Sequence, residues 1–327
     1  MNRVLLVDAD SKIPNLPLMK LSSYHEGKDD YVEFMKLDIS YYPSFKNRKH
    51  YISTSEYDKI YCSVVFRGSL KWINSDNMDK INFGGTGYSI EKKLPDYIEN
   101  LNPDYSIYPD NNISYGFISR GCIRDCYFCV VQQKEGNIHQ VNTVDNIVKH
   151  SMTKFLDNNI LALPNHREIL IEIITKKIKC EFIQGLDIRL IDEGNSYLLS
   201  KMRCDNYIFA FDDWSYLDIM ELKLPLLSWR ADWQLKFFVY CHPDMEISNI
   251  IKRVEYLKGH KCLTYIMRDI SCYESKYKMF YTDLARWCNQ PNMYKKVSFS
   301  EFLHKSHPSE KASGRVFASE KLYKNNQ

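Results

Sequence analysis

The sequence predicts an α/β protein in which a partial (β/α)6 barrel follows a smaller parallel α/β domain. Apolar, strand-like runs recur from residue 113 onward at intervals of roughly 25 to 30 residues, with helix-length segments between them. A shorter pattern of the same kind precedes them. The chain has 327 residues, 44% hydrophobic and 26% charged, which is enough for one large domain and a smaller one.

The first domain is predicted to span residues 1–108. Apolar runs at 4–7 and 57–66 have the length and composition of buried strands, and the run at 80–87 ends in a glycine turn. Because these strands alternate with segments that fit helices, we expect a Rossmann-like parallel sheet. The stretch 101–112 is rich in Pro, Asn and Asp and marks the domain boundary.

The barrel is predicted to span residues 109–272. The active site of such a barrel lies at the carboxyl ends of its strands, so polar residues there are candidates for function. A helical extension and a basic tail are expected over 273–327, with a helix at 277–288 and loosely ordered residues from 304 onward. The barrel strands are expected at 115–119, 154–157, 180–185, 207–211, 235–241 and 262–267, and its helices at 143–152, 168–177, 196–201 and 247–257.

Composition narrows the class of protein. The chain has no run of about 18 apolar residues that would span a bilayer. Its start, Met1 to Asp8, turns acidic too soon for a signal peptide. The net charge of +3 is too small to indicate nucleic-acid binding by itself. We therefore expect a cytoplasmic protein whose ten cysteines are thiols or metal ligands rather than disulfides.

Three cysteines lie close together directly after the first predicted barrel strand. Cys122, Cys126 and Cys129 have the spacing C-x3-C-x2-C on one short loop. Three thiolates on such a loop can bind three irons of a cubane cluster and leave the fourth iron open to a cofactor. A structural zinc site usually takes two pairs of ligands, and no second C-x2-C is present. The cysteines therefore predict a [4Fe–4S] cluster.

This motif, with the aromatic Phe128 before its last cysteine, resembles the signature of the radical S-adenosylmethionine (SAM) superfamily, and the resemblance covers residues 113–270. It implies that the open iron binds SAM and that one electron from the cluster cleaves it. The resulting 5′-deoxyadenosyl radical would take a hydrogen atom from a substrate that the sequence does not identify. The resemblance also places Phe128 beside the adenine and implies a flavodoxin or ferredoxin as reductant. Residues 130–136 are similar to the segment that follows the cluster in methylthiotransferases.

The strand ends supply further candidates for SAM binding. The pair after the second strand stands where the family often has Gly-Gly-Glu, although the glycines are absent, and an Asx turn or helix cap is the alternative. The three polar residues after the third strand suit a carboxylate or ribose, or else an ion pair at the rim. The aspartate after the fourth strand suits a ribose or substrate, or else a helix cap. These candidates are Asp157 and Asn158, then Gln184, Asp187 and Arg189, and finally Asp212.

The N-terminal region resembles the cobalamin-binding-like domain that precedes many radical SAM barrels. The motif that supplies the lower axial ligand reads D-x-H-x-x-G. At His25 the residue two before is Ser23 and the residue three after is Lys28, so the motif is not met. We therefore expect a degenerate domain and regard cobalamin as an unlikely cofactor.

Other functions remain open at this point. A cobalamin-dependent radical SAM methyltransferase is the main alternative. A methylthiotransferase would carry a second three-cysteine cluster in the first domain, which has only Cys62. A non-catalytic iron–sulfur or zinc protein that binds nucleic acid would draw on a tail whose basic residues are Lys305, Lys311, Arg315, Lys321 and Lys324.

Overall fold

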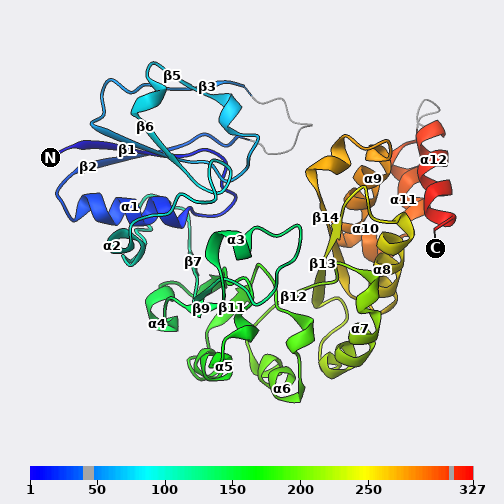
Figure 1. The fold of residues 1–327 in the computed structure, drawn as a ribbon. Coiled ribbons are helices and arrows are strands. Elements are labelled where there is room, and N and C mark those ends of the chain that lie inside the picture. The colour runs from blue at the N-terminus through cyan, green and yellow to red at the C-terminus, as the bar shows by residue number, and fades with distance from the viewer. Residues whose placement is uncertain (40–47, 309–312, 327) are drawn as a thin grey trace. The chain divides into compact units, whose positions relative to one another are not determined.

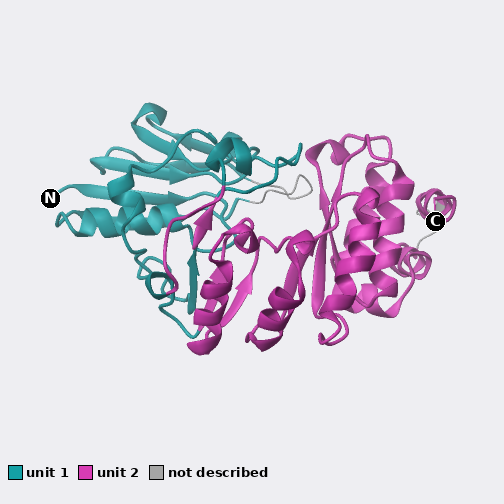
Figure 2. Cartoon of the chain, turned by 60° about the horizontal axis from the view of Figure 1, so that its bottom comes forward, with its two compact units in different colours: residues 1–116, 121–137, 145–151 teal, residues 117–120, 138–144, 152–327 magenta. Residues whose placement is uncertain are grey.

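The computed structural model describes residues 1–39, 48–308 and 313–326. Its contacts divide the chain into two compact units that do not follow chain order. Unit 1 comprises residues 1–116, 121–137 and 145–151, and unit 2 comprises residues 117–120, 138–144 and 152–327 (Figure 2).

Unit 1 is built on a parallel four-stranded sheet in the order β2-β1-β4-β6. The order reverses between β1 and β4, the point where open α/β sheets bind ligands at their carboxyl edge. Helices α1 and α2 lie on one face of this sheet, and the short pair β3 and β5 lies on the other (Figure 1). The elements are β1 (Arg3–Asp8), α1 (Leu16–Glu26), β2 (Tyr31–Lys36), β3 (His50–Ile52), β4 (Lys59–Ser63), β5 (Ile73–Ser75), β6 (Ile81–Gly84) and α2 (Asp96–Glu99).

Alternation along β1 explains why both faces are covered. Val4 and Leu6 pack under α1 and α2, whereas Leu5 and Val7 pack toward β3 and β5. All four side chains are buried, as expected for a central parallel strand with a continuous apolar run. Because the four strands are parallel, their carboxyl ends lie at one edge of the sheet. The buried polar residues Asp8, Asp10 and Ser63 lie at this edge.

Unit 2 contains five parallel strands, which match five of the six strands expected for the barrel within a few residues. The strands β10 and β11 pair with each other, and β12, β13 and β14 pair in that order. Isolated bridges between Lys179 and Arg203 and between Leu186 and Phe209 continue β11 onto β12. The strands are β10 (Met152–Phe155), β11 (Lys179–Phe182), β12 (Tyr207–Ala210), β13 (Leu235–Cys241) and β14 (Leu263–Arg268), and the helices between them are α5 (His166–Thr175), α6 (Glu193–Lys201), α7 (Leu217–Lys223) and α8 (Ile247–Gly259).

The remaining expected strand, 115–119, is replaced by two short strands. The first is β7 (Ile113–Gly116) of unit 1, and the second is β8 (Ser119–Arg120) of unit 2. Strand β8 pairs antiparallel with β9 (His139–Gln140), so the chain turns back on itself around the cysteine loop. The expected helix at 143–152 is limited to one turn, α4 (Val144–Ile147). The structure is thus a mixed α/β fold with parallel sheets.

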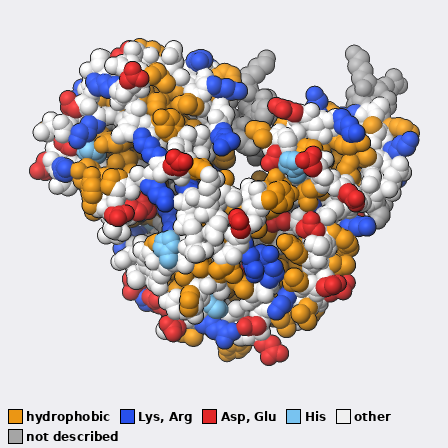
Figure 3. Space-filling model, viewed as in Figure 1, with side chains coloured by type: hydrophobic (Ala, Val, Ile, Leu, Met, Phe, Trp, Pro, Cys, Tyr) orange, Lys and Arg blue, Asp and Glu red, His pale blue; other side chains and the backbone are white. Residues whose placement is uncertain are grey.

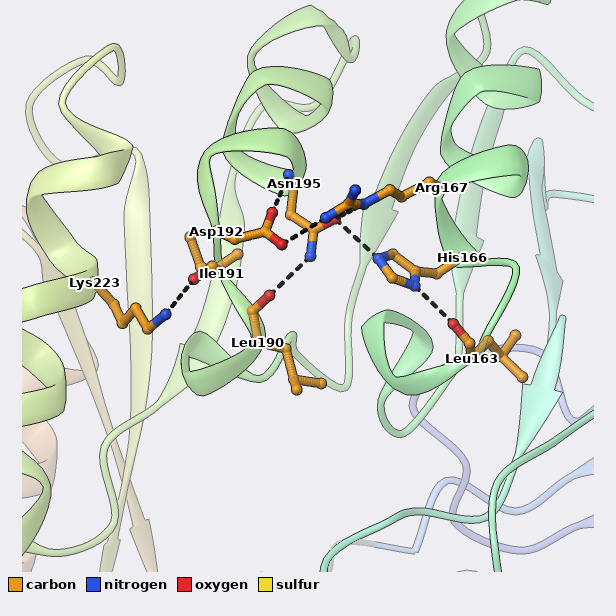
Figure 4. Close-up of polar contacts among 8 residues, drawn as sticks. All are labelled: Leu163, His166, Arg167, Leu190, Ile191, Asp192, Asn195 and Lys223. Atoms are coloured by element: carbon orange, nitrogen blue, oxygen red, sulfur yellow. Dashed lines mark hydrogen bonds and ion pairs between the residues drawn. The ribbon is translucent and has the colours of Figure 1, made fainter.

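A polar network joins the first turns of α5 and α6 (Figure 4). Asn195 of α6 is buried; its side chain donates to the Leu190 carbonyl (2.8 Å) and contacts His166 Nε2 (2.9 Å). Asp192 caps α6 by accepting from the Asn195 backbone N–H at 2.7 Å. Arg167 of α5 donates to the same Asn195 side chain at 3.2 Å. These contacts fix the starts of the two helices, and hence the loops that follow β10 and β11.

The C-terminal region is helical as expected, but the prediction of a loosely ordered tail from residue 304 is wrong for the part of it that is described. Helices α9 (Lys278–Cys288), α10 (Pro291–Lys296), α11 (Phe299–Ser306) and α12 (Ser313–Lys324) follow the last strand. The rings of Trp287, Phe299 and Tyr323 pack together and hold α12 against α9 and α11. Aromatic contacts between helices thus outweigh the polar composition of this segment.

None of the helices in the described ranges is long and apolar enough to cross a bilayer. On the face drawn in Figure 3, lysine and arginine side chains are interspersed with aspartate and glutamate on both units.

Candidate active site

The cysteine loop closes on itself through its glycines. Gly121 has a φ of +79°, and a Cβ there would lie 2.3 Å from the Asn137 carbonyl oxygen, so only glycine fits. Its N–H donates to the Glu135 carboxylate at 3.0 Å, and the Cys122 N–H donates to the Gly136 carbonyl at 3.1 Å. These two hydrogen bonds join the start of the loop to its end, so the three cysteines lie on one closed loop.

The three clustered thiols are the accessible ones in the chain. Cys122 and Cys126 are partly exposed and Cys129 is exposed, whereas the other seven cysteines are buried. Burial raises the pKa of several of those seven, to about 12 for Cys241, which disfavours the thiolate that binds metal. The Cys129 N–H donates to the Cys126 carbonyl at 2.8 Å, which forms a tight turn between these two cysteines. This donor set fits an iron–sulfur cluster chemically.

A cubane cluster spreads its three thiolates over three different irons. The described residues contain no group of three or more His, Cys, Asp or Glu side chains placed to hold a single metal ion. The cluster assignment of the three cysteines stays a prediction. Phe128 is half-buried and lies edge-to-face against the exposed Tyr127, with ring centroids 5.2 Å apart.

The cysteine loop is tied to the carboxyl edge of the unit 1 sheet. The helix α3 (Val131–Glu135) follows the last of the three cysteines. It carries Lys134, whose ammonium donates to Thr86 Oγ1 at 2.6 Å. Thr86 lies in the glycine turn that follows β6. A Cβ on Gly85 or Gly87 would collide with the backbone after β4, whereas a Cβ on Gly84 would meet no atom within 4 Å. The turn therefore packs tightly against the loop after β4, whereas a side chain at Gly84, the last residue of β6, would meet no neighbouring atom.

Buried polar groups fix the neighbouring strand ends. The Asp10 carboxylate accepts from the backbone N–H groups of Val65 (2.8 Å) and Phe66 (2.9 Å), which joins the loops after β1 and β4. The Tyr108 hydroxyl donates to the Asp8 carboxylate at 2.8 Å. Desolvation and the nearby Asp8 charge raise the pKa of Tyr108, so it stays neutral. This edge is a rigid, polar platform.

His25 lies away from that platform, in the last turn of α1. Its ring is fully buried, with Nδ1 2.8 Å from the Asp30 carboxylate and Nε2 3.3 Å from the Tyr61 hydroxyl. Burial lowers the pKa of His25. The ring is engaged on both nitrogens and is not placed to ligate a group at the carboxyl edge.

Asp157 follows β10 and is committed to the segment that leads into the cysteine loop. Its carboxylate accepts from the backbone N–H groups of Ile118 (3.3 Å) and Ser119 (2.5 Å) and from the Ser119 hydroxyl (2.6 Å). Desolvation outweighs these hydrogen bonds and raises the pKa of Asp157 to about 6. Asn158, its neighbour, is only half-buried.

The structure brings three of the predicted residues together after β11 and β12. Asp187 receives the Arg189 guanidinium at both carboxylate oxygens, at 2.6 and 3.1 Å. Arg189 also acts electrostatically on Asp212, whose pKa burial raises in spite of this cation. Gln184 is exposed on the same loop. Sequence reasoning missed Asn159, whose amide donates to Asp187 at 3.3 Å; the Asn158-Asn159 pair was its signal.

No family model matches the chain, and no curated protein matches it in sequence. Solved structures do match its fold. Two of them are the radical SAM methyltransferase TsrM from Kitasatospora setae, one with cobalamin and a [4Fe–4S] cluster bound and one with tryptophan substrate and the SAM analogue aza-SAM. Both are 12% identical to this chain and cover 81% of it; the TM-scores are 0.58 and 0.57, with 74% and 72% of the TsrM chain covered.

The comparison corrects the expectation that cobalamin is an unlikely cofactor. That expectation relied on the missing D-x-H-x-x-G motif. TsrM, which shares this fold over most of both chains, binds cobalamin together with a [4Fe–4S] cluster. The mismatch at His25 therefore does not exclude a corrinoid. At this level of identity the likeness shows that the chain has the fold of a radical SAM methyltransferase.

Proposed function

We propose that this chain is a cobalamin-dependent radical SAM methyltransferase, with a partial (β/α)6 barrel preceded by a Rossmann-like domain. Cys122, Cys126 and Cys129 would hold the [4Fe–4S] cluster. The proposal is supported by the fold likeness to TsrM and by the three accessible thiols on one closed loop. We prefer this function to hydrogen abstraction without methyl transfer, because hydrogen abstraction alone would leave the N-terminal sheet without a role.

The hydrogen bond between Lys134 and Thr86 carries the proposal. It attaches the helix after the cysteines to the glycine turn at the carboxyl edge of the sheet. Both residues belong to unit 1, as does the cysteine loop between Gly121 and Asn137. A corrinoid at this edge would lie beside the cluster loop. When bound, the cluster and cobalamin supply electron transfer and methyl carriage.

The other proposed roles belong to SAM and the reductant. Asp187 holds Arg189 in place, and the guanidinium suits the SAM carboxylate. Asp212 would accept from a ribose hydroxyl. The further proposed SAM contacts are Phe128, Asp157, Asn158 and Gln184. A flavodoxin or ferredoxin would supply electrons.

Anaerobic reconstitution with iron and sulfide tests the cluster. We expect about four irons per chain and the absorbance of a [4Fe–4S] cluster. Alanine at Cys122, Cys126 or Cys129 should abolish it, whereas Cys204→Ser, at a buried thiol that donates to the Asn206 carbonyl, should leave it intact. Zinc retained in place of iron would show that the assignment is wrong.

Adding hydroxocobalamin and then SAM tests the methyltransferase assignment. We expect stoichiometric corrinoid that survives desalting and, under reducing conditions, S-adenosylhomocysteine detected by mass spectrometry. A chain that binds the cluster, forms 5′-deoxyadenosine and retains no corrinoid would instead be a hydrogen-abstracting radical SAM enzyme.

A further inference from the structure

Helices lie against one face of the sheet β12–β13–β14, since α8 contacts β13 and β14 and α9 contacts β14 (Figure 1). Leu235, Phe237 and Val239, which share one face of β13, are fully buried. Successive strand residues point to opposite faces, so Lys236, Phe238 and Tyr240 belong to the other side. Lys236 and Phe238 are only half-buried there.

This second, partly exposed side carries two aromatic rings next to the small residue Ala210. Ala210, Phe238 and Tyr265 are register neighbours on the three strands. The Phe238 and Tyr265 rings lie edge-to-face, with centroids 5.8 Å apart. Ala210 is exposed, and Met267, two residues beyond Tyr265 on the same face, is 43% exposed. A small residue next to two rings leaves space for a planar group that can stack against them.

Lys236, two residues before Phe238 on β13, is a cation without a counter-ion. The Lys236 ammonium is 4.6 Å from the Tyr265 ring centroid and 5.8 Å from that of Phe238. In the described part of the chain it makes no hydrogen bond or ion pair. The nearest anion is Glu181, which Lys154 already pairs at 3.5 Å. Two cations thus face one carboxylate, and desolvation lowers the pKa of Lys236. One further anionic group would balance the charge.

We propose that this face is the substrate wall: a planar, apolar ring of the substrate lies in the gap at Ala210 against Phe238 and Tyr265, and a carboxylate of the same molecule pairs with Lys236. The substrate class is therefore an aromatic carboxylic acid, and Ala210 limits the size of its ring. Tyr240 lies four residues beyond Lys236, about 13 Å along the strand, at the carboxyl end where such barrels do their chemistry. The inference deepens the proposed function, since it identifies what would be methylated.

Binding of 2-naphthylacetate and of its neutral isostere 2-naphthylacetamide to the full-length chain tests the wall. Titration calorimetry should give the acid a Kd about tenfold below that of the amide, because only the acid forms a charge-assisted pair. Lys236→Met should remove that difference and leave amide binding unchanged. Lys261→Met, which removes a surface lysine paired with Asp232, is the matched control and should change neither.

Ala210→Phe should weaken both ligands about tenfold or more by filling the gap, and far-UV circular dichroism should confirm that each variant is folded. Equal affinity for acid and amide, or an acid preference that survives Lys236→Met, would overturn the proposal. The assay needs no cluster, SAM or cobalamin. A chain that transfers no methyl group can still prefer the acid to the amide, and an active methyltransferase can show no such preference. The two proposals can therefore be contradicted independently.

Discussion

Lys134, in the short helix after the clustered cysteines, donates a hydrogen bond of 2.6 Å to Thr86 in the glycine turn after β6. The two residues are 48 positions apart in sequence. This contact ties the loop proposed to hold the cluster to the sheet edge proposed to hold the corrinoid.

Lys134→Met should uncouple the two proposed cofactors without preventing either from binding. The lost hydrogen bond frees the loop relative to the turn, while the three thiols remain. We expect unchanged iron content and a SAM-dependent methyl transfer rate lowered about tenfold, which corresponds to about 1.4 kcal/mol and is close to the lower limit for one charge-assisted bond. Lys149→Met, on another segment of unit 1, is the control. An unchanged rate in the Lys134 variant would argue against the coupling.

Gly84→Leu should block the corrinoid while preserving the fold. A side chain here meets no atom within 4 Å and the backbone is not in the left-handed region, so the protein accommodates it. We expect cobalamin retention after desalting to fall several-fold. Gly259→Leu, at a similarly open position at the end of α8, should retain cobalamin normally. Full retention in both variants would place the corrinoid elsewhere.

Asp157→Asn should flatten part of the pH dependence of stability. The folded state raises the pKa of this carboxyl from its ordinary 3.8 to about 6, so the folded chain binds this proton more tightly than the unfolded chain. The stabilisation is complete below the unfolded pKa and is lost as pH rises through about 6. The free energy of unfolding of the native protein, relative to the Asn variant, should therefore rise as pH falls from about 7 to about 4.5. Urea denaturation at several pH values measures it, with Asp205→Asn, at an exposed ion pair with Lys179, as the control. A pH-independent difference would contradict the raised pKa.

Arg253→Lys should destabilise unit 2 strongly. The Arg253 guanidinium is fully buried and donates to the carbonyls of Phe211 (2.8 Å) and Tyr240 (3.1 Å), which joins the ends of β12 and β13 to α8. Lysine carries the charge but not the planar fork. We expect a loss of about 2 to 4 kcal/mol in the free energy of unfolding. Arg203→Lys, at an exposed arginine that donates to Lys177, should cost well under 1 kcal/mol. A similar loss of unfolding free energy in both variants would show that the planar guanidinium of Arg253 does not stabilise unit 2.

Arg315→Met should release α12 from the bundle. Arg315 Nε donates to the buried Asp283 carboxylate at 2.9 Å, and His307 Nε2 lies 3.1 Å from the same group. Without the guanidinium the carboxylate is left with weaker partners, at a cost of about 2 kcal/mol. Hydrogen exchange should rise in α12 and stay unchanged in α5. Lys321→Met on the same helix is the control, and protection of α12 in the Arg315 variant would show that its aromatic contacts are sufficient.

Local signals in the sequence found most of the strands. The runs that became β12, β13 and β14 were placed within one or two residues, because parallel strands carry nearly continuous apolar runs that are visible in the sequence. The run at 115–119 was placed less well, because it contains the break between β7 and β8. Strand β8 is defined by its pairing with β9, which the sequence of the run does not reveal. The tail was misjudged because Phe299 and Tyr323, far apart in sequence, form one aromatic contact.

The sequence by itself determined that three cysteines share one short loop and predicted their cluster, because spacing and residue type act within a few positions of one another. Only the tertiary structure decided which other residues these groups contact. Asp157, a proposed SAM contact, also accepts a hydrogen bond from Ser119, and His25, at which the D-x-H-x-x-G motif is not met, is paired with Asp30. Tertiary structure also revealed the unpaired Lys236 beneath two rings, since each depends on strands brought together by packing rather than by sequence. Contacts between residues distant in sequence have no local signature, and that is why folding, not motif, specifies them.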